Sequence, residues 1–106
     1  MVLEVAVLDV LPGRGPSFRR DFNKAQQIIC AMSGYIDHQL QRCIEKPDRY
    51  ILLVNWESIE DHTIGFRQSA EYREWKKILH HHYDPFPVVE HYEAVFSSAA
   101  MTPPQS

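Results

Sequence analysis

Two segments of this chain read as β-strands with apolar side chains on both faces, and this pattern restricts the possible folds more than any other feature. The first segment, 1–11, carries only two charged residues, Glu4 and Asp9. Its faces alternate as Leu3, Val5 and Val7 on one side and Ala6, Leu8 and Val10 on the other. The second segment, 49–57, is apolar on both faces as far as Asn55. Strands of this kind have to be covered on both sides.

Helical periodicity separates the two strands. After the loop sequence Pro-Gly-Arg-Gly-Pro, apolar residues recur at steps of three and four, which is the period of an amphipathic helix. The helix is predicted over 17–33, with Ser17 as its N-cap and Gly34 as the left-handed residue at its C-terminal end. Its apolar stripe consists of Phe18, Phe22, Ala25, Ile29 and Met32.

A β-hairpin follows the helix. Residues 35–45 and 49–57 flank the short turn Lys46-Pro47-Asp48, which predicts two antiparallel strands. Alternation in the first of these strands places Ile36, His38, Leu40, Arg42 and Ile44 on one face. The hairpin therefore adds one partly polar strand next to the apolar one.

The region after the hairpin predicts a helix in two parts and a last strand. Ser58 and Asp61 form a capping-box-like start for a short helix, and Ser69 caps a second one. The second helix ends before the two prolines of 84–87, which cannot continue it. Residues 88–96 then read as a strand.

The order strand, helix, strand, strand, helix, strand is that of a ferredoxin-like α+β fold. It predicts a four-stranded antiparallel sheet with both helices on one face. We expect one domain over 1–97 and a flexible tail over 98–106. The second sheet face is apolar but has no cover within the chain, so we expect a homodimer that buries this face against a second copy.

Charge and composition narrow the classes of function. The chain has 106 residues and a formal net charge of −3, which argues against nucleic acid as a partner. It has no apolar run long enough to span a membrane and no secretory signal pattern at its N-terminus. Two cysteines, Cys30 and Cys43, do not make a disulfide framework. A cytoplasmic protein is expected, and neither cysteine is assigned a role.

Several residues together carry a resemblance to a known family. They are Asn55-Trp56-Glu57-Ser58 at the end of the hairpin, His62 on the short helix, and Ser69-Ala70-Glu71-Tyr72 at the start of the next helix. In this arrangement the chain resembles the antibiotic biosynthesis monooxygenase family over about residues 2–96. The resemblance implies a dimeric α+β barrel. It also implies the oxidation of a small phenolic, aromatic or quinol substrate by molecular oxygen, without metal or flavin as cofactor.

One branch of this family cleaves haem, and this chain departs from its pattern. That branch binds iron through a histidine in the middle of the second helix and places a tryptophan before the helix. At the matching positions this chain has Lys76 and Phe66, and Trp75 lies on the helix itself. The haem-degrading reading is therefore disfavoured.

His62 is the candidate for the catalytic base or an oriented donor. It shares a stripe with Ile59 and Phe66, so it should face the sheet, and imidazole has an ordinary pKa of about 6.5. The alternative is a core histidine that is bonded to a backbone carbonyl. Trp56 could wall a substrate pocket or be a core residue. Asn55 is a candidate donor, although strand alternation directs it to the face opposite Trp56.

The second helix and the last strand offer further candidates for substrate binding. Phe66, Tyr72 and Trp75 could wall the pocket, and the last two could equally belong to the core. On the last strand His91 and Glu93 share one face and Tyr92 the other, and the sequence does not choose between them.

The run His80-His81-His82 raises the question of a metal site. Consecutive helical residues point about 100° apart, so the three imidazoles cannot converge on one ion. We predict no metal there and read the run as polar side chains at a helix end. The leading hypothesis is a cofactor-independent monooxygenase with a small aromatic ligand. The alternative is a ligand-binding module of the same fold without catalysis.

Overall fold

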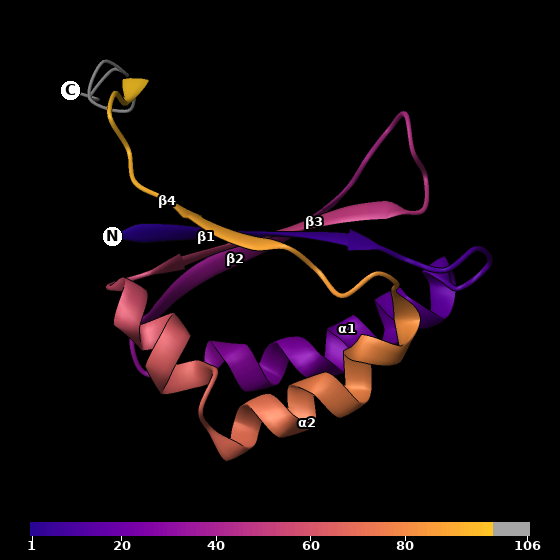
Figure 1. Cartoon of the computed structure of the whole chain (residues 1–106), viewed down its shortest axis with the longest axis horizontal. Helices are drawn as coiled ribbons and strands as arrows, with labels where there is room; N and C mark the ends of the chain where they lie inside the picture. The colour runs from indigo at the N-terminus through magenta and orange to yellow at the C-terminus, as the bar shows by residue number, and fades with distance from the viewer. Residues whose placement is uncertain (99–106) are drawn as a thin grey trace.

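The computed structural model describes residues 1–98 (Figure 1). The chain forms the strands β1 (Val2–Asp9), β2 (Tyr35–Arg42), β3 (Arg49–Trp56) and β4 (Val89–Tyr92). Its helices are α1 (Gly15–Cys30) and α2 (Ala70–Leu79), with a π-helical segment η1 (Asp61–Phe66) and a 3₁₀ turn η2 (His80–His82). The sheet has the order β2-β3-β1-β4, and each neighbouring pair is antiparallel. This is the ferredoxin-like α+β fold that the sequence predicts.

Both long helices cover one face of the sheet, and the core lies between the two layers (Figure 1). The helix-facing side chains of β1 and β3 are buried, and they meet the apolar stripe of α1. The buried apolar residues are Ala6, Leu8, Val10, Phe18, Phe22, Ala25, Ile29, Tyr50, Leu52, Val54, Trp56, Phe66, Trp75, Leu79 and Tyr83. Alternation along β1 and β3 thus directs every second side chain of these strands toward the helices, as the two-sided pattern predicts.

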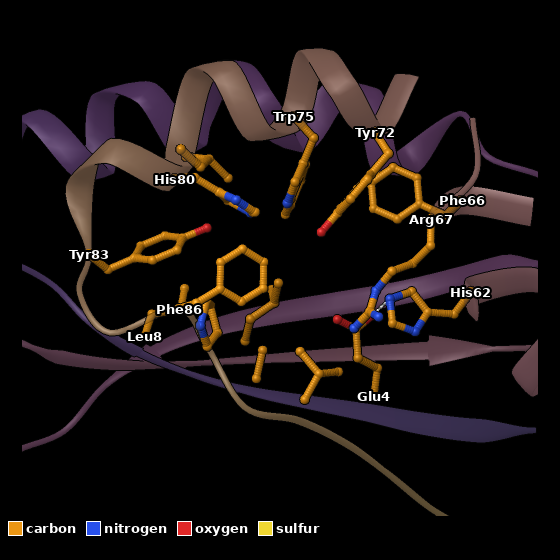
Figure 2. A pocket seen from close by; sticks show the side chains of 15 residues that line it. Glu4, Leu8, His62, Phe66, Arg67, Tyr72, Trp75, His80, Tyr83 and Phe86 are labelled. Atoms are coloured by element: carbon orange, nitrogen blue, oxygen red, sulfur yellow. Dashed lines mark ion pairs between the residues drawn. The ribbon is translucent and has the colours of Figure 1, made fainter. Parts of the chain in front are cut away.

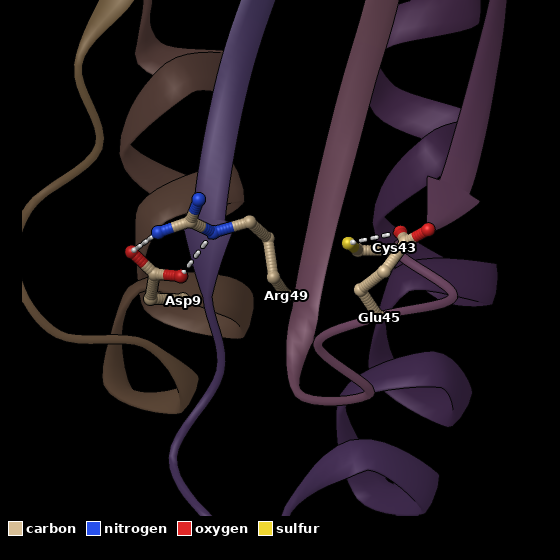
Figure 3. A network of polar contacts seen from close by, with 4 residues as sticks. All are labelled: Asp9, Cys43, Glu45 and Arg49. Carbon is tan, nitrogen blue, oxygen red and sulfur yellow. Dashed lines mark hydrogen bonds and ion pairs between the residues drawn. The ribbon is translucent and has the colours of Figure 1, made fainter.

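The other sheet face carries a band of half-buried apolar side chains, and no described helix lies on it. The band is formed by Leu3, Val5, Val7, Ile51 and Leu53; across the ladder Val5 pairs with Leu53 and Val7 with Ile51. We call these five residues the open-face band. At one end it is bounded by the ion pair of Asp9 with Arg49, whose Nε lies 2.8 Å from Oδ1 (Figure 3).

The opposite end of the open-face band is also polar. There Asn55 donates a hydrogen bond of 2.7 Å to Asp37 on the neighbouring strand. On the hairpin beyond the ion pair, the thiol of Cys43 lies 3.7 Å from Glu45 (Figure 3). The band is therefore an apolar surface with a polar rim, as is common for surfaces that pack against another protein.

Helix α1 begins and ends earlier than predicted. Pro16 lies in its first turn, where proline is favourable, so the helix starts at Gly15. Ser17 is inside the helix and is not its cap, because its hydroxyl donates back to the carbonyl of Arg14 at 3.0 Å. Gly34 has the predicted left-handed conformation with φ of +82°, but it lies in the connection to β2.

The outer strands also differ from the prediction. A register shift between Tyr35 and Asp37 breaks the alternation of β2, so Ile36 is exposed and does not share the face of His38. The predicted strand 88–96 forms sheet pairs only over 89–92: the chain leaves the ladder after Tyr92, which pairs with Leu3, although β1 extends one residue further to Val2.

Two features bear on the extent of the domain. The tail predicted over 98–106 lies, apart from Ser98, outside the described residues. The longest helix in 1–98 has 16 residues, and none combines the length and apolar character of a membrane span.

Candidate functional site

A cavity lies between the helix layer and the sheet, near the end of α2 (Figure 2). The apolar lining consists of Ala6, Leu8, Leu52, Phe66, Trp75, Leu79, Phe86, Pro87 and Val89. The polar lining consists of Glu4, His62, Arg67, Tyr72, His80 and Tyr83. A mostly apolar wall with a few converging polar groups is the usual composition of a small-molecule site.

The cavity is narrow in this structure. About 40 Å³ is open to the centres of water-sized molecules, which is room for a few waters. Phe86, on the segment between η2 and β4, points among the lining residues in Figure 2 although its side chain is 63% exposed. Its ring meets the imidazole of His80 edge-on at 4.9 Å between centroids. An aromatic molecule would need the Phe86 ring to move aside.

A chain of buried polar groups lies at one end of the cavity. The indole Nε1–H of Trp56 donates to Oε1 of Glu4 at 3.0 Å. Nε2 of His62 lies 3.3 Å from the same oxygen. Nδ1 of His62 lies 2.8 Å from Nε2 of His91. Glu4 and His62 are both at most 5% exposed, so this series of polar contacts leads from the interior to the half-buried His91.

The fold explains why these four side chains meet. Glu4 faces the helices because it lies in the buried row of β1, and it pairs with His91 directly across the ladder to β4. Trp56 ends β3 on the same face. His62 is brought over both strands by η1, and the turn that leads into η1 is held by the Ser58 hydroxyl accepting the amide of Asp61 at 3.2 Å.

The π-helical form of η1 sets how His62 is presented. The amide of Arg67 donates to the carbonyl of His62 at 2.9 Å, a bond to the fifth residue back in place of the fourth. With this wider turn His62 and Phe66 both point inward and are buried, whereas Ile59 of the predicted stripe is 39% exposed. Arg67 follows immediately and extends over Glu4 and His62 (Figure 2).

Burial shifts the protonation of Glu4 and His62 in opposite directions. Loss of hydration raises the pKa of Glu4 to about 7, although the Trp56 bond and the charge of Arg67 oppose the shift. The pKa of His62 is lowered to about 3, mainly by loss of hydration and in smaller part by the charges of Arg67 and His91. At mildly acidic pH the two residues are therefore a neutral carboxylic acid and a neutral imidazole, not an ion pair.

The raised pKa of Glu4 predicts a pH-dependent stability difference between the wild type and Glu4→Gln. Between pH 4.5 and about 7 the folded chain keeps a proton on Glu4 that the unfolded chain has lost, so this residue makes folding less favourable as pH rises. Glutamine lacks this effect. We expect the stability of Glu4→Gln relative to wild type to increase by about 2 kcal/mol from pH 5 to pH 8.

Urea unfolding of both proteins at equal concentration measures this difference. Some histidines also have lowered pKa values and make stability depend on pH. Because they are present in both proteins, their contribution cancels in the difference between the variant and the wild type. A stability difference that stays constant over this pH range would contradict the buried neutral acid. Glu57→Gln, at an exposed position, serves as the control and should show no such trend.

The structure brings most of the predicted site residues together. His62, Phe66, Tyr72 and Trp75 line one cavity. Trp56 lies behind it, fully buried, with its ring stacked on His62 at 5.4 Å. Asn55 lies on the open sheet face with its amide on Asp37, and it does not reach the cavity. The catalytic and binding roles of these residues stay predictions.

Five residues with polar or ionisable side chains in the lining or the network are not among the predicted site residues. Glu4 had a visible signal, since it is the one charged residue in the otherwise apolar buried row of β1. The sequence does not choose between the two faces of the last strand, and it does not show that His91 meets His62. Arg67 lies in a turn, His80 in the short segment η2 and Tyr83 in an isolated bridge to Val10, so no sustained periodicity predicts the direction of these side chains.

The three consecutive histidines do not converge on one point, but two of them come together, since the rings of His81 and His82 lie 4.0 Å apart between centroids. His80 lines the cavity, and His81 is exposed. His82 is buried and places Nε2 at 2.7 Å from the carboxylate of Asp21 on α1. One ligand atom from each of Asp21, His81 and His82 falls within 4.8 Å of the others. The Asp21–His82 contact joins the end of α2 to α1.

Comparison with known proteins places the chain among related sequences. The family model of antibiotic biosynthesis monooxygenases matches residues 1–78. An uncharacterised protein of Bacillus subtilis strain 168, YczJ, is 50% identical over 95 residues, which are 90% of this chain and 100% of that protein.

Solved structures show the same fold. A Bordetella bronchiseptica protein, provisionally described as an antibiotic biosynthesis monooxygenase, is 35% identical with a TM-score of 0.86, covering 90% of this chain and 97% of that one. SnoaB of Streptomyces nogalater, described as a cofactor-independent oxygenase, is 17% identical with a TM-score of 0.75, covering 91% of this chain and 94% of that one. The second likeness concerns the fold alone.

Proposed function

Because the chain belongs to the antibiotic biosynthesis monooxygenase family, we propose that it oxidises a small phenolic or quinol-like aromatic substrate with molecular oxygen, without metal or flavin. The observation that carries this proposal is the buried carboxylic acid and imidazole at the end of an aromatic-lined cavity. The description of SnoaB as a cofactor-independent oxygenase on the same fold is consistent with it.

The proposed oxidation requires the protein to position the substrate and to transfer a proton. A substrate such as an anthrone, once deprotonated, is electron-rich enough to reduce oxygen itself. Its methylene group becomes a carbonyl that keeps one atom of O₂, and the other atom leaves as water. The protein contributes by favouring the deprotonated substrate and by excluding bulk water. Glu4 and His62 hold the protons, and the apolar lining excludes water.

The remaining lining residues have roles in binding. Phe66, Tyr72 and Trp75 offer aromatic faces to a flat substrate. Arg67 brings a positive charge to the same cavity, which favours the anionic form of a phenol or enol. Trp56 supports the site from behind through its bond to Glu4.

A homodimer is part of the proposal. The open-face band is too apolar to be left in water, and a second copy that presents the same band would bury both. A twofold arrangement is self-complementary and closes after two copies. The sheets would then face each other, with the two cavities on the outer, helix-covered sides.

Oxygen consumption and ligand fluorescence together test the proposed function. Anthrones, naphthols and hydroquinones are added to the protein, and oxygen uptake is corrected for autoxidation with heat-denatured protein. In parallel, quenching of Trp75 fluorescence reports binding, with Trp75→Phe as the control because Trp56 does not line the cavity. We expect saturable uptake for at least one class, together with quenching. Fluorescence quenching without oxygen uptake across the panel would overturn the proposed oxidation and favour a ligand-binding module. Absence of both quenching and uptake would overturn the proposed substrate site.

A further inference from the structure

We propose that Glu4 is the group that accepts the substrate's proton, that His62 positions Glu4, and that His91 connects the pair to solvent. This inference rests on the proposed function, and it assigns the proton transfer within that site to a residue other than the histidine that the sequence suggests. It is carried by the hydrogen bond between His62 and His91, by the close polar contact of 3.3 Å between His62 and Glu4, and by the surfaces that these side chains reach.

Both ring nitrogens of His62 are already engaged. Nε2 is 3.3 Å from Oε1 of Glu4, and Nδ1 is 2.8 Å from Nε2 of His91. An imidazole takes up a proton only at a ring nitrogen, so His62 has no free nitrogen to turn toward a substrate. It can orient a neighbour, but it does not reach the reacting atom.

Glu4, in contrast, has an oxygen to spare. The contacts from Trp56 and His62 both fall on Oε1. A carboxylate has two oxygens, so Oε2 is the atom that a molecule in the cavity would meet. Figure 2 shows the carboxylate at the cavity end beside Arg67 and His62. The side chain is held in place by two partners and is open toward the substrate.

The proton transfer balances without any further reactant. The hydroxyl or enol O–H bond of the substrate breaks, a new O–H bond forms at Oε2, and the negative charge passes from Glu4 to the substrate oxygen. Arg67, which lines the same cavity, stabilises that charge. When the substrate anion has added oxygen at the carbon that becomes the carbonyl, Glu4 returns the proton to the outer oxygen of the resulting peroxide. The O–O bond then breaks as that carbon loses its remaining hydrogen as a proton, the carbonyl forms, and this proton and the departing hydroxide make water. No net proton is consumed by the cycle.

The groups around Glu4 make both of its charge states accessible near neutral pH. Trp56 from β3 and Arg67 after η1 lower its pKa, and burial raises it, with the outcome at about 7. Tyr72 of α2 and His91 of β4 are the other titratable groups facing the pair, besides His62 itself. A base that works near its own pKa transfers protons most efficiently in both directions.

His62 and His91 let the hydrogen-bonded chain follow the state of Glu4. When Glu4 is ionised, the Nε2–H of His62 donates to it and Nδ1 accepts from His91. When Glu4 is protonated, it donates to Nε2, and the Nδ1–H donates to His91. Two neutral tautomers thus satisfy every bond in each state. His91 is half-buried beside Tyr92 at the sheet edge, so the series of polar contacts from Glu4 through His62 ends at the molecular surface.

The kinetic test uses Glu4→Gln, with Glu57→Gln as the matched control that removes an exposed carboxylate. Glutamine keeps an oxygen for the Trp56 N–H but cannot accept a proton. With the substrate that gives the fastest oxygen uptake, we expect kcat/KM of Glu4→Gln to fall at least 100-fold. Fluorescence binding should change less than fivefold, and the control should match the wild type. A Glu4→Gln enzyme with more than a tenth of wild-type kcat/KM would overturn the assignment.

The pH profile separates positioning from mere structural support. Wild-type kcat/KM should rise with pH through a midpoint near 7 as Glu4 ionises. His62→Phe removes the donor that stabilises ionised Glu4, so its midpoint should move to higher pH while activity above the midpoint is largely kept. His62→Gln, which can donate again, should restore the midpoint. An equal loss at every pH in His62→Phe would show that His62 only supports the fold.

A second readout does not require turnover. The phenolate of 4-nitrophenol is yellow, so its absorption reports the ionisation of the bound molecule. In the wild type, bound nitrophenol and Glu4 share one proton, and the absorption should rise in two steps with pH. In Glu4→Gln it should rise in one. Two steps in a wild type that consumes no oxygen would refute the proposed oxidation and keep the proton acceptor. One step in both proteins, or failure of 4-nitrophenol to bind at millimolar concentration, would refute the acceptor.

Discussion

Replacing Leu53 by arginine should leave the protein monomeric at micromolar concentration, whereas the wild type should sediment as a dimer. Leu53 lies in the middle of the open-face band, paired with Val5 across the ladder. A twofold interface brings each substitution in twice, so two charges enter an apolar contact without partners. At about 3 kcal/mol for each charge, dimerisation weakens by more than about 1,000-fold.

Sedimentation velocity over a concentration series measures the dissociation, and Gln27→Arg is the matched control. Gln27 is exposed on α1, so it gains the same charge on the helix-covered side. This control should remain dimeric. A Leu53→Arg protein that stays dimeric would show that the interface does not lie on the open-face band. A wild type that is monomeric at all concentrations would refute the proposed dimer.

Replacing Gly34 by alanine should cost about 3 kcal/mol of stability and should disturb the site from a distance. Gly34 has φ of +82°, which costs a residue with a Cβ about 1–2 kcal/mol. A Cβ at this position would also overlap the carboxylate of Asp61. The Asp61 carboxylate would have to move away from Ser58, and it would lose the hydrogen bond that the Ser58 hydroxyl donates to it, at about 1 kcal/mol.

Gly13→Ala is a matched control for this experiment. Gly13 has the same φ of +82°, but no atom lies within 4 Å of the position that its Cβ would take. Urea unfolding should show a loss of about 1 kcal/mol for Gly13→Ala. Because η1 carries His62, only the Gly34 variant should also lower oxygen uptake with the best substrate. Equal losses of stability in the two variants would show that displacing the Asp61 side chain does not lower the free energy of unfolding.

The order of elements could be predicted because each one has its own local signal. The stripe from Phe18 to Ile29 indicates a helix whatever surrounds it, and Ser69 caps α2 as expected by accepting the amide of Tyr72 at 3.1 Å. Boundaries that depend on tertiary contacts were less accessible. β4 ends at Tyr92 although β1 extends past that pair to Val2, and residues 93–96 contain no glycine or proline that would mark the end, so the local sequence does not show this boundary.

The site was only partly accessible for the same reason. His62, Phe66, Tyr72 and Trp75 lie on periodic stripes, so their inward direction follows from the sequence. The partners of His62 are different, because Glu4 is 58 positions away along the chain and His91 is 29 positions away. Only the register that pairs Glu4 with His91, and the π-helical turn above them, bring the three together.

The strand order also decides how the sheet can fail. The two edges are formed by β2 and β4, while the apolar strands β1 and β3 are enclosed between them. The β2 edge exposes Asp37, Gln39, Gln41 and Arg42 and is twisted by its register shift, and β4 offers only four residues. Charged, bulged or short edges are poor templates for adding further strands. The chain therefore keeps its most amyloid-prone segments out of reach of edge-to-edge growth, so that polymerisation into fibrils would first require β2 or β4 to detach.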